Sequence, residues 1–226
     1  FFEILLIASY SLLIHGVGKE KTKATFHYVT LNLLGSALFL FALGILYGTL
    51  GTLNMADMAL KAANISGSEQ QLASTGVLLL MIVFGLKSAM IPLHFWLTRT
   101  YGAAVAPVAA LFAIMTKVGI YSMYRVHLQV FGDHAGELAN LTNQWLWPLA
   151  TITVVAGTVG VLASRRLKDV ASWLVIVSVG SLLFSVALNN IQATAAGLYY
   201  LLHSTLVTAA LYLLADLINK QRGQAG

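Results

Sequence analysis

The sequence contains no cysteine and few charged residues. Of its 226 residues, 9% are Asp, Glu, Lys or Arg and 58% are hydrophobic, and the mean hydropathy is +0.81. Without cysteine, the chain cannot hold iron–sulfur clusters, c-type haem, thiolate zinc sites or disulfides. We therefore expect no metal and no cofactor, and any redox chemistry would need a partner protein. Soluble domains have about 25% charged residues, so most of this chain is expected to lie in lipid.

Two further features are missing at the start of the sequence. No charged segment followed by a short apolar run and a cleavage site opens it, so no signal peptide is predicted. The chain begins at Phe1 inside an apolar run and without an initiator Met, so we expect an internal fragment of a longer membrane protein. The formal net charge is +5, but no basic patch is interleaved with aromatic residues, so nucleic acid is not an expected partner.

Apolar runs of membrane-spanning length recur along the chain. A hydrocarbon core of about 30 Å requires roughly 20 residues of helix, and no alternating strand pattern is present. The sequence predicts an all-α polytopic membrane protein with about seven transmembrane helices. Their expected ranges are 1–15, 26–50, 73–97, 104–131, 144–163, 170–189 and 194–218.

The basic residues alternate between the connections of these segments. Every second connection is basic, and these hold Lys19, Lys21, Lys23, Arg99, Arg165, Arg166, Lys168, Lys220 and Arg222. The opposite connections contain one basic residue, Lys61, among acidic ones. By the positive-inside rule, the basic connections are predicted to be cytoplasmic. In the longest connection, Asn54 with Asp57 three residues later predicts an N-cap and a short helix at the membrane interface.

Three charged residues, Glu3, Lys87 and Lys117, fall inside predicted spans rather than towards their ends. Because a charge at mid-bilayer costs about 2.5–3.5 kcal/mol on insertion scales, an intramembrane ionisable residue indicates a function by default. The structural alternative is snorkelling, which suits a lysine close to a helix end. Lys87 and Lys117 lie ten or more residues from both ends of their spans, so a functional role is favoured for them. For Glu3 the two interpretations are evenly balanced.

Pro92 and His203 complete the candidate residues. Proline lacks a backbone donor, so Pro92 predicts a broken helix near Lys87. We expect a polar cavity or water to satisfy the freed backbone groups, as where ions cross transporters; an ordinary packing kink is the alternative. Histidine titrates near neutrality, so His203 suits a proton relay. The alternatives for it are a neutral histidine bonded to a neighbouring helix and, less favoured, a haem ligand.

Several stretches resemble the antiporter-like subunits, a family that includes Mrp-type cation/proton antiporters and the proton-pumping membrane arm of complex I. They are residues 2–6 (FEILL), 85–89 (GLKSA), 91–97 (IPLHFWL) and 116–121 (TKVGIY). Residues 46–57 and 199–205 are most similar to the branch of the family that holds the D subunits of Mrp-type antiporters. The resemblance covers essentially the whole chain.

The resemblance implies a fold of fourteen helices with two inverted five-helix repeats. Residues 1–226 would be one proton-conducting transmembrane domain that holds helices five to eleven. Glu3 matches the family's helix-five glutamate, Lys87 the lysine of the broken helix seven, Lys117 the helix-eight lysine, and His203 a polar position in or just before helix eleven. Many relatives have a second histidine and a lysine in that helix. This sequence has Ser204 and Thr208 instead, whose hydroxyls do not titrate in the working range, which weakens side-chain transfer through helix eleven.

The resemblance also implies a function. The chain would belong to a subunit of a multisubunit Na⁺ or K⁺/proton antiporter in the bacterial plasma (inner) membrane, a transporter and not an enzyme. Its partners would be the other subunits of a hetero-oligomeric complex, the lipid bilayer, protons and a monovalent cation. Protons would pass Glu3, Lys87, Lys117, His203 and water along the membrane midplane. A nearby carboxylate favours the charged lysine, so separating Glu3 from Lys87 would release the proton.

Two alternatives stay open at this point. The first is an antiporter-like, proton-pumping subunit of complex I (NADH:quinone oxidoreductase) or of a related membrane hydrogenase. The second is a non-conducting membrane scaffold, for which the buried lysines would be an unexplained cost. The sequence has no intramembrane carboxylate cluster that would chelate sodium, so the coupling cation is expected to pass through a partner subunit.

Overall fold

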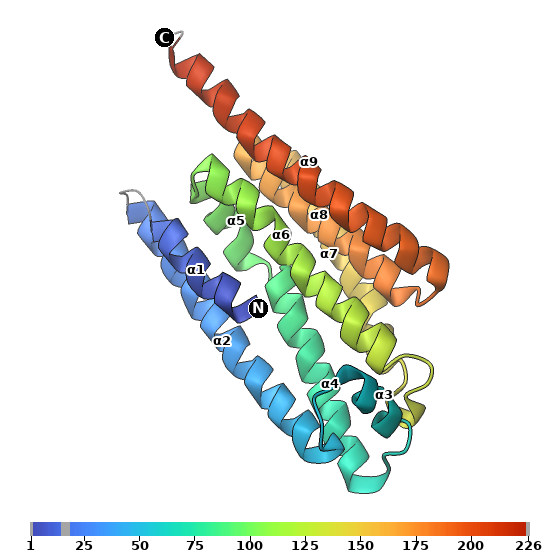
Figure 1. The fold of residues 1–226 in the computed structure, drawn as a ribbon. Coiled ribbons are helices and arrows are strands. Elements are labelled where there is room, and N and C mark those ends of the chain that lie inside the picture. The colour runs from blue at the N-terminus through green and yellow to red at the C-terminus, as the bar shows by residue number, and fades with distance from the viewer. Residues whose placement is uncertain (1, 15–18, 225–226) are drawn as a thin grey trace.

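The computed structural model describes residues 2–14 and 19–224, and within these ranges the chain forms helices and their connections (Figure 1). The elements are α1 (Phe2–Ile14), α2 (Lys19–Leu50), α3 (Met55–Ala62), α4 (Gly67–Ser88), α5 (Phe95–Ala103), α6 (Ala106–Met123), the π-helix η1 (Tyr124–Val130), the 3₁₀-helix η2 (Gly136–Leu138), α7 (Asn143–Ala163), α8 (Leu167–Ala187) and α9 (Ile191–Gln224).

Six segments of the described chain are long and apolar enough to cross a membrane. They are Thr22–Leu50, Gly67–Ser88, Ala106–Val130, Gly136–Ala163, Leu167–Ala187 and Ile191–Gly223. The remaining predicted segment, at residues 1–15, corresponds to α1, which has 13 residues and is shorter than a full span. The prediction of an all-α polytopic membrane fold is confirmed.

The apolar run predicted at 73–97 is divided into two helices, as Pro92 indicated. α4 ends at Ser88, α5 begins at Phe95, and Pro92 lies between them. Ala89 closes α4 in the left-handed region at φ 60°, and the N–H of Met90 donates to the carbonyl of Gly85 at 2.9 Å. This is the usual way in which a helix end satisfies its last carbonyls. The predicted broken helix is therefore present.

The helices pack as a bundle in which α4 and α5 lie between α2 and α6, with α1 beside α2 and α9 along α6 and α8 (Figure 1). α7 and α8 pack most extensively against each other, and glycines permit their close approach. A Cβ on Gly157 would lie 3.0 Å from the backbone nitrogen of Val177, and one on Gly180 would lie 2.8 Å from that of Val154. Small residues at such contacts allow membrane helices to approach closely.

The two ends of the bundle differ in charge, as the alternation of the connections predicts. At one end, Asn54 caps α3 by accepting from the backbone N–H groups of Ala56 and Asp57 at 3.0 and 3.4 Å. The predicted N-cap is thus confirmed. Lys61 lies 3.0 Å from Asp57 and lowers the pKa of that carboxyl.

At the other end, basic residues from separate connections come together. Lys23, Arg99, Arg165 and Arg166 line one cavity there. The connections that the sequence marked as basic therefore share one end of the bundle, opposite α3 (Figure 1).

Candidate functional site

Lys87 lies in the last turn of α4, immediately before the helix break. It is 2% exposed, so it does not reach solvent by snorkelling. Its ammonium donates to the carbonyl of Asn32 at 3.3 Å and to Oγ of Ser36 at 3.2 Å, both on α2. The C-terminal end of a helix also favours a positive charge. The break therefore places Lys87 where a buried ammonium is stabilised by polar groups on two helices.

Three residues of α2 make this contact possible. Ser36 is bonded back to the carbonyl of Asn32 at 2.9 Å, so the two acceptors for Lys87 form one polar patch on an otherwise apolar helix. At Gly35, a Cβ would lie 3.4 Å from Cε of Lys87, so glycine admits the lysine stem. Sequence reasoning missed Asn32 and Ser36. Their spacing of four residues within an apolar span was the available signal.

Side chains of neighbouring helices satisfy the backbone of the break. The indole N–H of Trp96, on α5, donates to the carbonyl of Leu86 at 2.9 Å. The N–H of Ile91 donates to Oγ1 of Thr153, on α7, at 3.2 Å. Our expectation that a polar cavity or water would do this was wrong for these two groups, because α5 folds back and α7 packs directly against the break.

Lys117 lies in α6 and is fully buried, at 0% exposure. Its Nζ has no hydrogen-bond partner among the residues that the structure describes, and neither has Oγ1 of Thr116. Burying an unpaired ammonium is costly, so this position suits a charge that is present only transiently.

Lys117 is near the break because α6 packs tightly on the last turn of α4. A Cβ on Gly119 would lie 3.1 Å from the carbonyl oxygen of Phe84 and 3.1 Å from the backbone nitrogen of Ser88. The last turn of α4, which carries Lys87, therefore rests on the turn of α6 that follows Lys117. The structure brings the helix segments of the two candidate lysines together.

Of the other two ionisable candidates, the structure describes the side chain of only one, His203, and places it on an exposed face. The side chain of Glu3 lies outside the described residues. His203 is exposed on α9, and its ring centroid lies 6.5 Å from that of Tyr199 and 6.4 Å from that of Tyr200. Ser204 and Thr208 are instead buried, at 6% exposure each. The interior face of α9 thus carries the hydroxyls, and His203 lies on another face.

A second buried group was missed by sequence reasoning. His127, in η1, is 2% exposed, and within the described part of the chain neither of its ring nitrogens has a hydrogen-bond partner. Its ring lies edge-on to Phe84 of α4, with centroids 6.1 Å apart. The only signal was a histidine in the apolar run 104–131. A local π-helix of this kind often lies at a functional site.

With this geometry in view, the relationship to known proteins is clear. The model of the family described as NADH:quinone oxidoreductase/Mrp antiporter, TM, matches residues 1–225. The chain belongs to this family. This antiporter-family chain is 44% identical over 222 residues to the D subunit of a probable K⁺/H⁺ antiporter from Rhizobium meliloti (strain 1021), covering 98% of this chain and 41% of the relative. It is 39% identical over 226 residues to the D subunit of a Na⁺/H⁺ antiporter from Bacillus subtilis (strain 168), and the match covers 100% of this chain and 45% of that relative.

The fold of the antiporter-family chain is also similar to a solved structure. A chain in the Mrp complex from Dietzia sp. DQ12-45-1b matches with a TM-score of 0.82 and 27% identity, over 94% of this chain and 39% of that one. This chain therefore spans less than half the length of each of these relatives. The resemblance to the D subunits of Mrp-type antiporters is confirmed, and the protein is a multi-pass protein of the plasma membrane.

Proposed function

We propose that this chain is the proton-translocating part of a subunit in a multisubunit Na⁺ or K⁺/proton antiporter, a transporter and not an enzyme. The two relatives described above support this proposal, because they are named as D subunits of K⁺/H⁺ and Na⁺/H⁺ antiporters. The other subunits of a hetero-oligomeric membrane complex would be its partners, and protons and a monovalent cation its cargo. Residues 1–226 would be one domain that holds helices five to eleven of the family fold.

The observation that carries the proposal is the pair of buried lysines on two helices in contact. Lys87 has oxygen partners that stabilise its ammonium, whereas Lys117 has no hydrogen-bond partner in the described chain. A proton held at Lys87 can therefore be passed to Lys117 when the Lys87 site is disturbed, and Lys117 does not retain it. A structural role would not require a second, unpaired amine.

The remaining proposed residues extend this path in both directions. Glu3 would load Lys87, because a carboxylate stabilises a neighbouring ammonium. Beyond Lys117, the buried hydroxyls of Ser204 and Thr208 would hold water on the interior face of α9, and His203 would take the proton from there. Hydroxyls both donate and accept, so they support a water chain without titrating.

A second candidate function follows from the breadth of the family. Its description also covers NADH:quinone oxidoreductase, so the same lysines would serve a redox-driven proton pump. The driving force distinguishes the two candidates. An antiporter responds to sodium or potassium, whereas a redox pump responds to an electron donor.

Both candidates are tested in inside-out vesicles that carry the full-length protein in its native complex. A pH gradient is imposed, sodium or potassium is added, and the collapse of the gradient is followed with a pH-sensitive dye. We expect cation-dependent collapse in the wild type and in Lys61→Ala, whose lysine lies half-exposed in the last turn of α3. Lys87→Ala and Lys117→Ala should abolish it. Collapse that survives in both variants would refute the path, and pumping driven only by an electron donor would favour the second candidate.

A further inference from the structure

A basic cavity lies at the end of the bundle opposite α3. Its volume is about 860 Å³, and it is bounded by the start of α2, the end of α5, the α7–α8 connection and the first turns of α8. A volume of this size is typical of small-molecule sites. Neither Lys87 nor Lys117 lines it, so it is separate from the proposed proton path.

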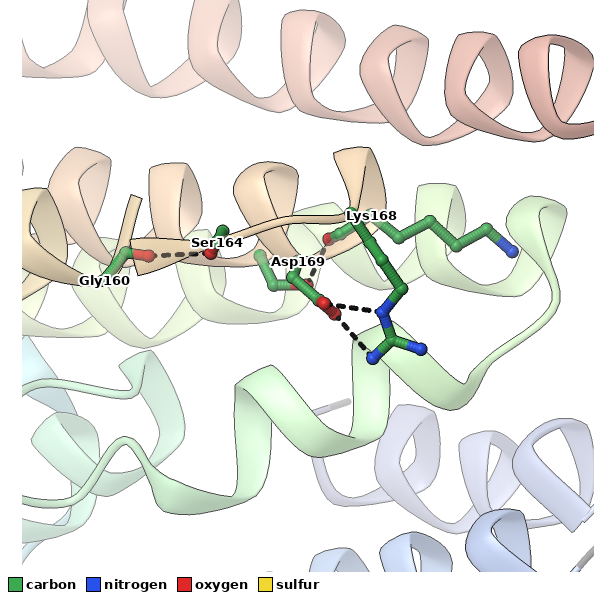
Figure 2. A network of polar contacts seen from close by, with 6 residues as sticks. Gly160, Ser164, Lys168 and Asp169 are labelled. Carbon is green, nitrogen blue, oxygen red and sulfur yellow. Dashed lines mark hydrogen bonds and ion pairs between the residues drawn. The ribbon is translucent and has the colours of Figure 1, made fainter. Parts of the chain in front are cut away.

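The charges around this cavity are strongly unbalanced. Four cationic side chains line it, those of Lys23, Arg99, Arg165 and Arg166, against one carboxylate, that of Asp169. Arg166 donates to both oxygens of Asp169, at 2.8 and 3.3 Å (Figure 2). The positive charge of Arg166 and the negative charge of Asp169 therefore cancel. The other three cations form no hydrogen bond or ion pair with any described residue, so the cavity attracts anions and repels sodium, potassium and hydronium.

Other features of the walls suit a phosphate group at a membrane surface. α8 begins at Leu167 beside the cavity, so the positive end of its dipole adds to the basic field. Ser164 lies in the same wall, with its hydroxyl bonded to the carbonyl of Gly160 at 2.7 Å (Figure 2). Trp173 completes the wall, and tryptophan is enriched at the depth of lipid headgroups.

The position in the bundle indicates the source of such a phosphate. The cations come from connections that the positive-inside rule assigns to the cytoplasmic side. The cytoplasmic leaflet holds anionic lipids, and basic pockets between transmembrane helices on that side bind their headgroups. Inorganic phosphate has the same oxyanion chemistry, but it would not need a site between spanning helices.

We propose that this cavity binds the phosphodiester headgroup of an anionic phospholipid, with Lys23, Arg99 and Arg165 contacting its phosphate oxygens. A guanidinium can donate two parallel hydrogen bonds to one phosphate, so the two arginines supply most of the recognition. The bound headgroup ties α2 and the end of the broken helix to the α7–α8 connection.

The test uses the full-length protein in its purified complex, in detergent, titrated with fluorescently labelled phosphatidylglycerol. The paired substitution Arg99→Gln with Arg165→Gln should weaken binding about 30-fold, because each surface cation contributes about fivefold to binding an anionic membrane. Arg99→Lys with Arg165→Lys keeps the charge and should retain most of the affinity. Lys220→Gln with Arg222→Gln removes two cations near the end of α9, outside the cavity, and should bind as the wild type does.

Three results would overturn the proposal. The first is wild-type affinity in the glutamine pair, and the second is equal binding of labelled phosphatidylcholine, which has no net charge. The third is displacement of the labelled lipid by millimolar inorganic phosphate, which would assign the cavity to free phosphate. Salt titration of the wild-type protein gives a readout that does not depend on any variant folding. Binding must weaken as salt rises, and salt-independent binding would contradict the electrostatic site.

Discussion

The neighbouring helices α4 and α6 each carry a buried lysine, and the environments of these two lysines differ in polarity. α4 ends directly after Lys87, and this lysine gains a helix C-terminus and the oxygens of Asn32 and Ser36. α6 continues past Lys117 to Met123, and Lys117 has no hydrogen-bond partner within the described chain. The comparison shows that a broken helix provides the polarity that a buried charge needs, while an intact helix shields its own backbone and provides none.

The two environments suit the lysines to different tasks on the proposed path. A site that stabilises the ammonium can store a proton, so Lys87 is suited to storage. A site without partners releases the proton readily, so Lys117 is suited to transit. Four substitutions test whether this difference between α4 and α6 holds.

The largest effect is expected for Lys117→Leu, which keeps the apolar stem volume and removes the amine. Cation-dependent proton transport should fall at least about 100-fold, as for loss of a positioned proton-transfer group. Thermal stability of the purified full-length protein should be kept or increased, because a buried amine without a hydrogen-bond partner is replaced by an apolar side chain of similar size. Lys87→Leu should also stop transport but bring no gain in thermal midpoint. An equal gain in both variants would show that the two sites are alike.

Gly119→Ala tests the contact between the two helices. The new methyl group would press on Phe84 and Ser88 in the last turns of α4, and such overpacking should cost about 2 kcal/mol of unfolding free energy. Gly48→Ala is the matched control, because a Cβ on Gly48 meets nothing within 4 Å. Denaturant titration of the full-length protein in detergent, followed by circular dichroism, measures both. If Gly119→Ala is as stable as Gly48→Ala, the two helices are not in close contact at the break.

Trp96→Phe tests how much the hydrogen bond from the indole to the backbone near the helix break contributes to stability. It removes the indole donor of the Leu86 carbonyl, which then keeps only the backbone N–H of Ala89 at 3.2 Å, and the loss of this one hydrogen bond should cost about 1 kcal/mol. Trp145→Phe, at a residue of α7 that is 51% exposed, should change stability by less than about 0.5 kcal/mol. The same denaturant titration compares them. Equal midpoints would mean that the N–H of Ala89 alone is enough for the carbonyl of Leu86.

The smallest effect is expected for Ser36→Ala, which removes one of the two acceptors of Lys87 on α2. Loss of this hydrogen bond should cost about 0.5–1 kcal/mol. Among the described residues, the hydroxyl of Ser122 on α6 bonds only to the carbonyl of Val118 in its own helix, so Ser122→Ala should be nearly neutral. A shift in Ser122→Ala as large as that in Ser36→Ala would remove the distinction between the two lysine environments.

Much of the fold could be predicted because its signals are local. Apolar runs marked the spanning segments, Pro92 marked the break, and Asn54 marked the start of α3. The environment of Lys87 could not be predicted in the same way. Asn32 and Ser36 precede it by 55 and 51 residues, and which of the several helices lies against α4 is a property of the packing.

The faces of the helices could not be predicted either, and α9 shows why. Its central part is apolar on nearly all sides, so periodicity does not indicate which side is interior. The sequence singled out His203, but the structure places that residue on an exposed face and buries Ser204 and Thr208. The interior polar groups of α9 are therefore the hydroxyls.

The sequence by itself determined the membrane class, the approximate spans, the broken helix and the alternation of basic connections. Each of these depends on the apolar, charged and proline residues within a single helix or its adjoining connection. Only the tertiary structure decided which lysine has partners, which face of α9 is buried, and that cations from separate connections surround one cavity. These depend on how each helix is rotated and which helices are neighbours. In a uniformly apolar chain, close packing of side chains sets both.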